Sequence, residues 1–177
     1  MSGYDILRDT LIEYNQFKKS KLQFDIMKVL NCDYTEAFDL GKTHCNLLST
    51  WGLLYCQELT KFDYRQFYRV CLTKNYCNKK GFFYIDKVDT DAGPGLFTKM
   101  KIPCEIIKYD TIPEDLSPDR FFQIAINKKS HFMASASGED SNLYLFDTND
   151  RPYNTELIES LSVKKDKMTW LKEYKPI

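Results

Sequence analysis

The sequence is poor in the residues that common ligand sites require. Only 7 of its 177 residues are glycine, and none of them forms the glycine-rich loop that cradles nucleotide phosphates. Its two histidines and six cysteines include no CxxC pair, so no structural zinc site is expected. Lys plus Arg and Asp plus Glu both number 25, which leaves no net charge to hold nucleic acid or an anionic membrane.

Long apolar runs are also missing. None approaches the roughly 20 residues of a membrane-spanning helix. The N-terminal MSGYDILRDT carries charges where a secretion signal needs an apolar run. We therefore expect a cytoplasmic protein whose cysteines stay reduced. With 43% hydrophobic and 15% aromatic residues, the chain can fill one globular core, and its length fits a single domain over residues 1–177.

The first half of the sequence predicts helices. Apolar residues recur at helical spacing within residues 5–18. A second helix is expected over residues 45–59, CNLLSTWGLLYCQEL, with Thr43 or His44 as its cap. A third is expected to begin at Asp63, which has a glutamine three residues later in capping-box spacing.

The second half predicts strands, which makes an α+β layout. The loop at residues 89–97 contains Gly93, Pro94 and Gly95. Strand-like runs occur at residues 82–86, 104–109, 121–126, 131–137 and 143–148, and the last three of these are expected to form a meander.

Cys45 is a candidate nucleophile because it begins the predicted helix 45–59. A helix N-terminus carries partial positive charge and free N–H groups. Both favour a thiolate, and the same N–H groups can stabilise an oxyanion. A small buried thiol would fit the same position equally well. The other cysteines, including Cys56, Cys71, Cys77 and Cys104, are expected to be structural.

His131 and Asp147 are a candidate base and its orienting group. If the hairpin folds so that Ser137 faces Leu143, His131 and Asp147 become diagonal neighbours on one face of the sheet. An aspartate there fixes the imidazole tautomer and stabilises the charged ring. Asn149, directly opposite His131 in this register, and Asp150 are alternatives to Asp147, because a shift of one residue exchanges the faces.

In this order the three residues resemble papain-like cysteine peptidases. The likeness is closest to the double-glycine leader peptidases of bacteriocin exporters and their soluble relatives. It lies in HCNLLSTWGLLY, SHFMASAS and LYLFDTNDRP, with 86 residues from Cys45 to His131 and 16 from His131 to Asp147. It covers residues 40–150. Small proteins carried by bacterial plasmids and prophages are also similar.

The resemblance implies a papain-like α+β domain, with an N-terminal helical half packed on an antiparallel sheet. It implies a peptidase or amidase in which the Cys45 thiolate attacks an amide carbonyl, His131 transfers protons and Asp147 orients His131. No metal or organic cofactor is implied. The expected partner is a peptide or protein substrate, and a cell-wall peptide is one candidate if the gene belongs to a phage.

The sequence departs from the family at the oxyanion donor. The family has glycine beside its nucleophile and a glutamine a few residues upstream. Here His44 and Asn46 flank Cys45, and residues 36–44 contain no glutamine. Asn15, Gln16 and Asn46 are the possible substitutes. Without a donor the fold would serve as an inactive binding or accessory protein, which is the second interpretation; an unrelated phage structural protein is the third.

Overall fold

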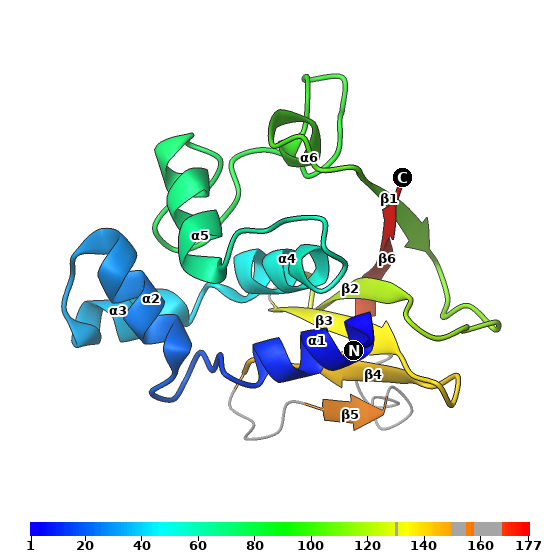
Figure 1. Ribbon diagram of the computed structural model, residues 1–177. Helices are drawn as coiled ribbons and strands as arrows, with labels where there is room; N and C mark the ends of the chain where they lie inside the picture. Colours follow the sequence, from blue (N-terminus) through cyan, green and yellow to red (C-terminus); the bar gives the residue numbers. More distant parts are fainter. Residues whose placement is uncertain (130, 150–154, 158–167) are drawn as a thin grey trace.

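The computed structural model describes residues 1–129, 131–149, 155–157 and 168–177 (Figure 1). Its helices are α1 (Gly3–Leu11), α2 (Lys21–Leu30), α3 (Tyr34–Gly41), α4 (Cys45–Tyr55), α5 (Tyr64–Thr73) and α6 (Leu96–Lys99). Its strands are β1 (Cys104–Tyr109), β2 (Phe121–Ile126), β3 (His131–Ser137), β4 (Leu143–Phe146), β5 (Thr155–Leu157) and β6 (Met168–Pro176). The predicted α+β class is confirmed.

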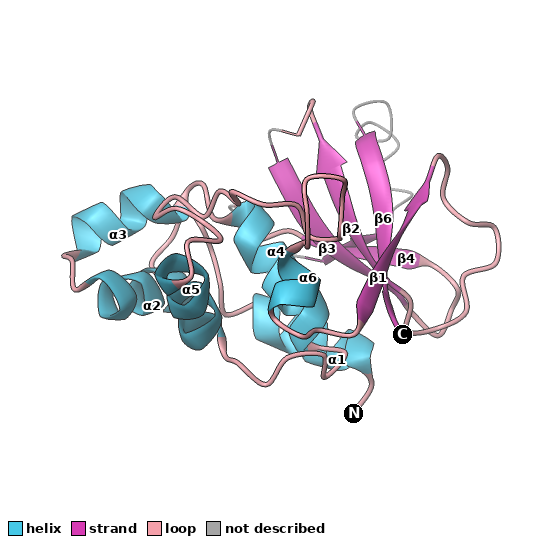
Figure 2. Ribbon diagram, turned by 90° about the horizontal axis from the view of Figure 1, so that it is seen from above, coloured by secondary structure: helices cyan, strands magenta, loops and turns pink. Residues whose placement is uncertain are grey.

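Helix α4 lies between the sheet and the helices α2, α3 and α5 (Figure 2). It contacts β2, β3, α1 and α5, and α1 also contacts β3 and β4. All of its residues are buried except Asn46 and Tyr55. Most of them are apolar, so the helix needs cover on nearly every side, which explains its central position. None of the helices in the described ranges is long and apolar enough to cross a membrane.

The helix ends agree with the predictions in part. Asp63 caps α5, and its capping box with Gln66 is formed from both sides, as predicted. The helix expected within residues 5–18 is shorter and ends at Leu11, and the one expected over 45–59 ends at Tyr55. His44 occupies the cap position of α4, but its side chain makes no capping hydrogen bond.

The sheet is antiparallel throughout, in the order β1-β6-β2-β3-β4-β5. The predicted meander of β2, β3 and β4 is confirmed, with Ser137 opposite Leu143. The C-terminal strand β6 inserts between β1 and β2, which the sequence pattern did not predict. The strand predicted over residues 82–86 is wrong: this segment forms one isolated bridge, from Phe83 to Cys77, and lies in a loop.

The two faces of the sheet contribute to different hydrophobic clusters. The face toward the helices contributes Phe121, Ala134 and Phe146 to the main core, which also holds Trp51 of α4. The opposite face carries a second cluster, made of Leu116, Phe122, Ile124, Ile126, Met133, Leu143, Leu145 and Leu171. Strand alternation therefore directs neighbouring residues of β2 and β3 into separate cores.

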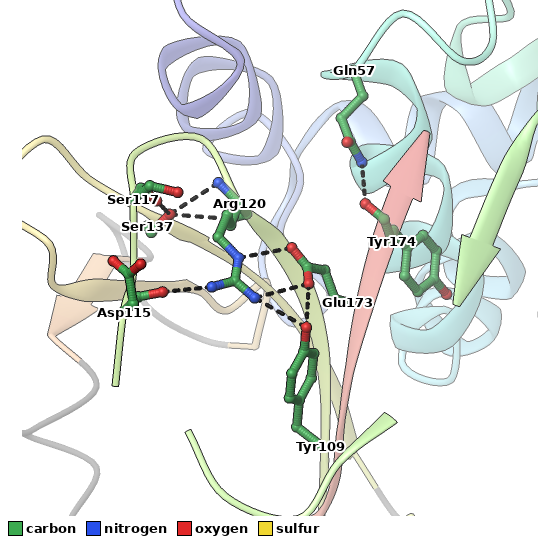
Figure 3. Close-up of polar contacts among 8 residues, drawn as sticks. All are labelled: Gln57, Tyr109, Asp115, Ser117, Arg120, Ser137, Glu173 and Tyr174. Atoms are coloured by element: carbon green, nitrogen blue, oxygen red, sulfur yellow. Dashed lines mark hydrogen bonds and ion pairs between the residues drawn. The ribbon is translucent and has the colours of Figure 1, made fainter. Parts of the chain in front are cut away.

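A polar network ties the loop before β2 to strands β1 and β6 (Figure 3). Arg120 donates to both carboxylate oxygens of Glu173, at 2.9 Å each, and to the Tyr109 hydroxyl at 3.0 Å. Tyr109 donates to Glu173 at 2.7 Å. Burial raises the pKa of Glu173, but the bonds from Arg120 and Tyr109 outweigh it and hold the pKa below its ordinary 4.5.

We expect Glu173→Gln to lower the free energy of unfolding at pH 7 by about 2–4 kcal/mol, because it leaves the partly buried Arg120 without its counter-charge. Since the pKa of Glu173 is lowered by folding, its contribution is complete above pH 4.5 and is lost as the pH falls through the folded value. The difference between the wild type and the variant should therefore shrink in acid. Denaturant unfolding of the wild type and the variant at pH 7 and pH 3 measures the loss of stability and its decrease in acid.

The exposed pair Lys42–Asp39 supplies the matched control. Asp39→Asn should change the free energy of unfolding by no more than about 1 kcal/mol at either pH. Equal effects of the two substitutions would contradict the structural importance of Glu173.

Candidate functional site

Cys45 is the first residue of α4 and is 8% exposed. Because α4 begins here, the backbone N–H groups of Cys45 and Asn46 have no acceptor in the helix. No carbonyl elsewhere in the described residues takes them either. The thiol therefore lies at the positive end of a helix with unused donors beside it.

His131 and Asp147 meet at the end of the β3–β4 hairpin. The imidazole Nε2 lies 2.8 Å from Oδ1 of Asp147, and both side chains are largely buried. The Cys45 thiol lies near enough to the His131 ring to help raise the pKa of the imidazole. Since Nε2 is engaged with Asp147, Nδ1 is the nitrogen left to face the sulfur. The structure thus brings the three predicted residues together in the order thiol, imidazole and carboxylate.

Charge in this group favours a protonated imidazole. Burial by itself lowers the pKa of His131, but the hydrogen bond that the ring donates to Asp147 and the nearby Cys45 thiol act in the opposite direction and raise the pKa to about 9. At neutral pH the ring is therefore an imidazolium. Its positive charge lies near a thiol at a helix N-terminus.

Within the described residues, Asp147 rather than Asn149 bonds the His131 ring. The backbone N–H of Asn149 donates to Oδ1 of Asp147 at 2.9 Å. This bond orients the carboxylate that accepts from the ring. Asp150 lies outside the described residues.

Gln16 holds the two halves of the site together. Its Nε2 donates to the carbonyls of Gly41 and Lys42, at 3.1 Å each, in the turn before Cys45. Its Oε1 accepts from the Thr148 hydroxyl at 2.8 Å, and its backbone N–H donates to the Thr148 carbonyl at 2.8 Å. Thr148 follows Asp147 directly. Gln16 therefore acts as a clamp that joins the turn before Cys45 to the residue after Asp147. Because its amide nitrogen already donates to two carbonyls, the expectation that it could donate to an oxyanion is not supported.

His44 is buried, and its side chain does not serve as the predicted cap of α4. Its ring bonds the Tyr64 hydroxyl at 2.6 Å and the Lys79 carbonyl at 2.9 Å. Burial lowers the pKa of His44 to about 4, so the ring is neutral at physiological pH. Its contacts place it in the helical core rather than with His131 and Asp147.

Sequence reasoning missed two residues beside Cys45. Lys87, in the loop after α5, and Gln123, on β2, both hydrogen-bond the Oδ1 of Asn46. Neither belongs to a motif, because a long loop brings one of them and a central strand brings the other. Among the described residues no group of three His, Cys, Asp or Glu is placed to hold a metal ion.

Comparison with protein-family models, with curated proteins and with solved structures finds no match for this chain. A thiol near an imidazole that is hydrogen-bonded to a carboxylate is the arrangement that nucleophilic cysteine catalysis uses.

We expect Gln16→Ala to weaken the link between Cys45 and His131. The substitution leaves buried groups on both sides of the site unpaired, at a cost of about 1–3 kcal/mol for each one. Both the free energy of unfolding and the selective alkylation of Cys45 at neutral pH should fall. Denaturant unfolding and peptide mass spectrometry measure the two effects.

Gln57 offers a matched control at the other end of α4. Its amide also donates to two carbonyls, that of Leu53 at 3.0 Å and that of Tyr174 at 3.1 Å. Figure 3 shows the bond to Tyr174. Gln57→Ala should destabilise the protein while leaving Cys45 reactivity unchanged. If both variants affect Cys45 alike, Gln16 acts only through general stability.

The two histidines should titrate at opposite extremes. We expect His44 to stay neutral down to about pH 4 and His131 to stay charged up to about pH 9. Because folding raises the pKa of His131 above 6.5, its contribution to stability is complete below pH 6.5 and is lost as the pH rises through about 9. Asp147→Asn should lower the pKa of His131 and leave His44 unaffected. Two-dimensional NMR of the imidazole groups tests this, and a wild-type His131 that titrates near 6.5 would contradict it.

Proposed function

We propose that this protein is a cysteine-dependent hydrolase that cleaves a peptide or other amide bond, with Cys45 as nucleophile, His131 as general acid and base, and Asp147 as the group that orients His131. The observation that carries this proposal is the His131–Asp147 hydrogen bond of 2.8 Å together with the nearness of the Cys45 thiol, which helps to raise the pKa of His131. These residues come from a helix start, a strand start and the end of the next strand, so the fold must bring them together.

The reaction follows from the charges of the three groups. The Cys45 sulfur attacks the carbonyl carbon, and the carbonyl π electron pair moves onto oxygen, which then accepts a hydrogen bond from the free N–H of Cys45. His131 then donates its proton to the leaving amine and afterwards removes one from the water that hydrolyses the thioester. Asp147 keeps the ring oriented and its charge stabilised throughout.

We propose further that the domain is of papain-like type. The buried helix beginning at Cys45 and packed on an antiparallel sheet that carries His131 supports this, as does the chain order of the three residues. The upstream glutamine of that family has no counterpart here, so the oxyanion donor must differ. A peptide or protein remains the proposed substrate, with cell-wall peptide as one candidate.

A non-catalytic binding protein with the same fold is the second candidate, and the engagement of Gln16 as a clamp favours it. Thiol reactivity separates the two candidates. A hydrolase needs one cysteine that reacts much faster than its solvent exposure would predict, whereas a binding protein needs no such cysteine.

Alkylation by iodoacetamide at pH 6 to 9, followed peptide by peptide, tests the proposed function. Cys45 should react fastest at pH 6 to 7, where ordinary thiols, with a pKa of about 8.5, are mostly protonated. Cys32 is the internal reference, since it is more exposed than Cys45, and burial raises the pKa of its thiol. His131→Ala should remove the advantage of Cys45.

Equal rates at Cys45 and Cys32 in the wild type would end the enzymatic proposal and favour the binding protein. Cys45→Ser serves as the control for peptide assignment. It removes the fast-reacting site and should leave the alkylation of Cys32 unchanged.

A further inference from the structure

The residue that follows Cys45 is held in a polar network that no step above uses. The Oδ1 of Asn46 accepts from the Lys87 ammonium and from Nε2 of Gln123, at 3.0 Å each. Lys87 also donates to Oε1 of Gln123 at 3.0 Å. Around the same ammonium stand the rings of Phe83, Phe132 and Trp170, with centroids at 5.4, 5.9 and 6.0 Å.

Lys87 fixes which way the two amides face. A lysine ammonium can only donate hydrogen bonds, so the atom that each amide turns toward Lys87 must be its oxygen. The Gln123 assignment is supported independently: its Nε2 donates to the Ser49 hydroxyl at 2.7 Å, and that hydroxyl itself donates to the Cys45 carbonyl at 2.7 Å. Both amides are therefore locked in one orientation.

This orientation leaves the Asn46 Nδ2 turned away from Lys87 and Gln123. Within the described residues nothing accepts a hydrogen bond from it, although Asn46 is half-buried. The amide thus offers two N–H donors on the residue that follows the nucleophile in the sequence, and the backbone N–H of Cys45 is also unused.

We propose that Asn46 is the side-chain oxyanion donor of the Cys45 site and that Lys87 is the residue that positions it. This inference rests on the proposed function and specifies the group that takes the place of the missing upstream glutamine. When the Cys45 sulfur bonds to a carbonyl carbon, the displaced π electron pair becomes an alkoxide. The alkoxide accepts one hydrogen bond from the Cys45 backbone N–H and one from Asn46 Nδ2.

The surroundings of Lys87 support a positioning role. Burial, followed by repulsion from Lys172, lowers the pKa of Lys87 to about 7, while Asp86 and Cys45 act in the opposite direction. The neutral amine still has two N–H donors, enough for the oxygens of Asn46 and Gln123. The orientation of the Asn46 and Gln123 amides is therefore kept whether or not Lys87 is charged. The charged form also places a cation near the thiol.

Two reagents separate the oxyanion from the nucleophile. p-Nitrophenyl acetate acylates a thiolate through a tetrahedral oxyanion, which collapses to an acetyl thioester and releases p-nitrophenolate. Iodoacetamide alkylates the same sulfur by displacing iodide, and no oxyanion forms. Changes in thiolate content affect both rates, so the ratio of acylation to alkylation at Cys45 reports the oxyanion donor alone.

We expect Asn46→Ala and Asn46→Asp each to lower this ratio by about 100- to 1,000-fold, the effect of losing one oxyanion donor. Asn46→Asp keeps the size of the side chain and an oxygen for Lys87 but has no N–H to donate. Lys87→Met, which keeps the length of the side chain and removes the donor, should lower the ratio less than either. Asn75→Asp, the same change at an exposed residue after α5, should leave it unaltered.

The outcomes distinguish the two proposals. If wild-type Cys45 is neither selectively alkylated nor acylated, the proposed function fails and this inference fails with it. If Cys45 is selectively alkylated but Asn46→Ala and Asn46→Asp keep the wild-type ratio, only the oxyanion assignment is overturned. If Asn46→Ala lowers the ratio and Asn46→Asp preserves it, Asn46 serves to anchor Lys87 and does not donate.

Discussion

Helix α4 is buried along almost its whole length, and this burial determines where the candidate site forms. The helix packs against β2 and β3 of the sheet and against α1 and α5. Only the first turn can combine burial with unused polar groups, because backbone N–H groups lack helical partners there. Cys45 lies in that turn, and β3, packed against the same helix, begins with His131. The site thus follows from the contact between one buried helix and one strand.

Apolar packing alone does not fix the rotation or the axial position of a helix, since the hydrophobic effect is not directional. Hydrogen bonds from three glutamines fix both for α4. Gln16 clamps the turn before it to the end of β4, Gln123 bonds Asn46 and Ser49 from the middle of the sheet, and Gln57 ties its last turn to β6. A neutral amide gives oriented hydrogen bonds without the desolvation cost of a buried charge. The position of Cys45 relative to His131 depends on these hydrogen bonds.

The two histidines have pKa values shifted in opposite directions because their surroundings differ. His44 is buried next to a hydroxyl and a carbonyl, so burial dominates and the pKa falls to about 4. His131 is also largely buried, but a carboxylate and a thiol contact its ring, and the pKa rises to about 9. The residue adjacent to Cys45 in sequence is thus a neutral core residue, whereas the distant one is the protonated partner of the thiol.

The sequence by itself determined the local features: the start of the helix at Cys45, the cap at Asp63, and the hairpin register that pairs Ser137 with Leu143. Each of these depends on residues near one another in the chain, so spacing and propensity suffice. Tertiary structure alone decided the insertion of β6 into the sheet and the loop that brings Lys87 to Asn46, because both join segments far apart in sequence. Strand alternation placed His131 on the face of Met133, whose cluster lies across the sheet from α4. His131 pairs with Ile126 of β2 but lies beyond the β3–β4 register, which begins at Ala134, so only the tertiary structure decides that its ring meets Asp147 and lies near Cys45.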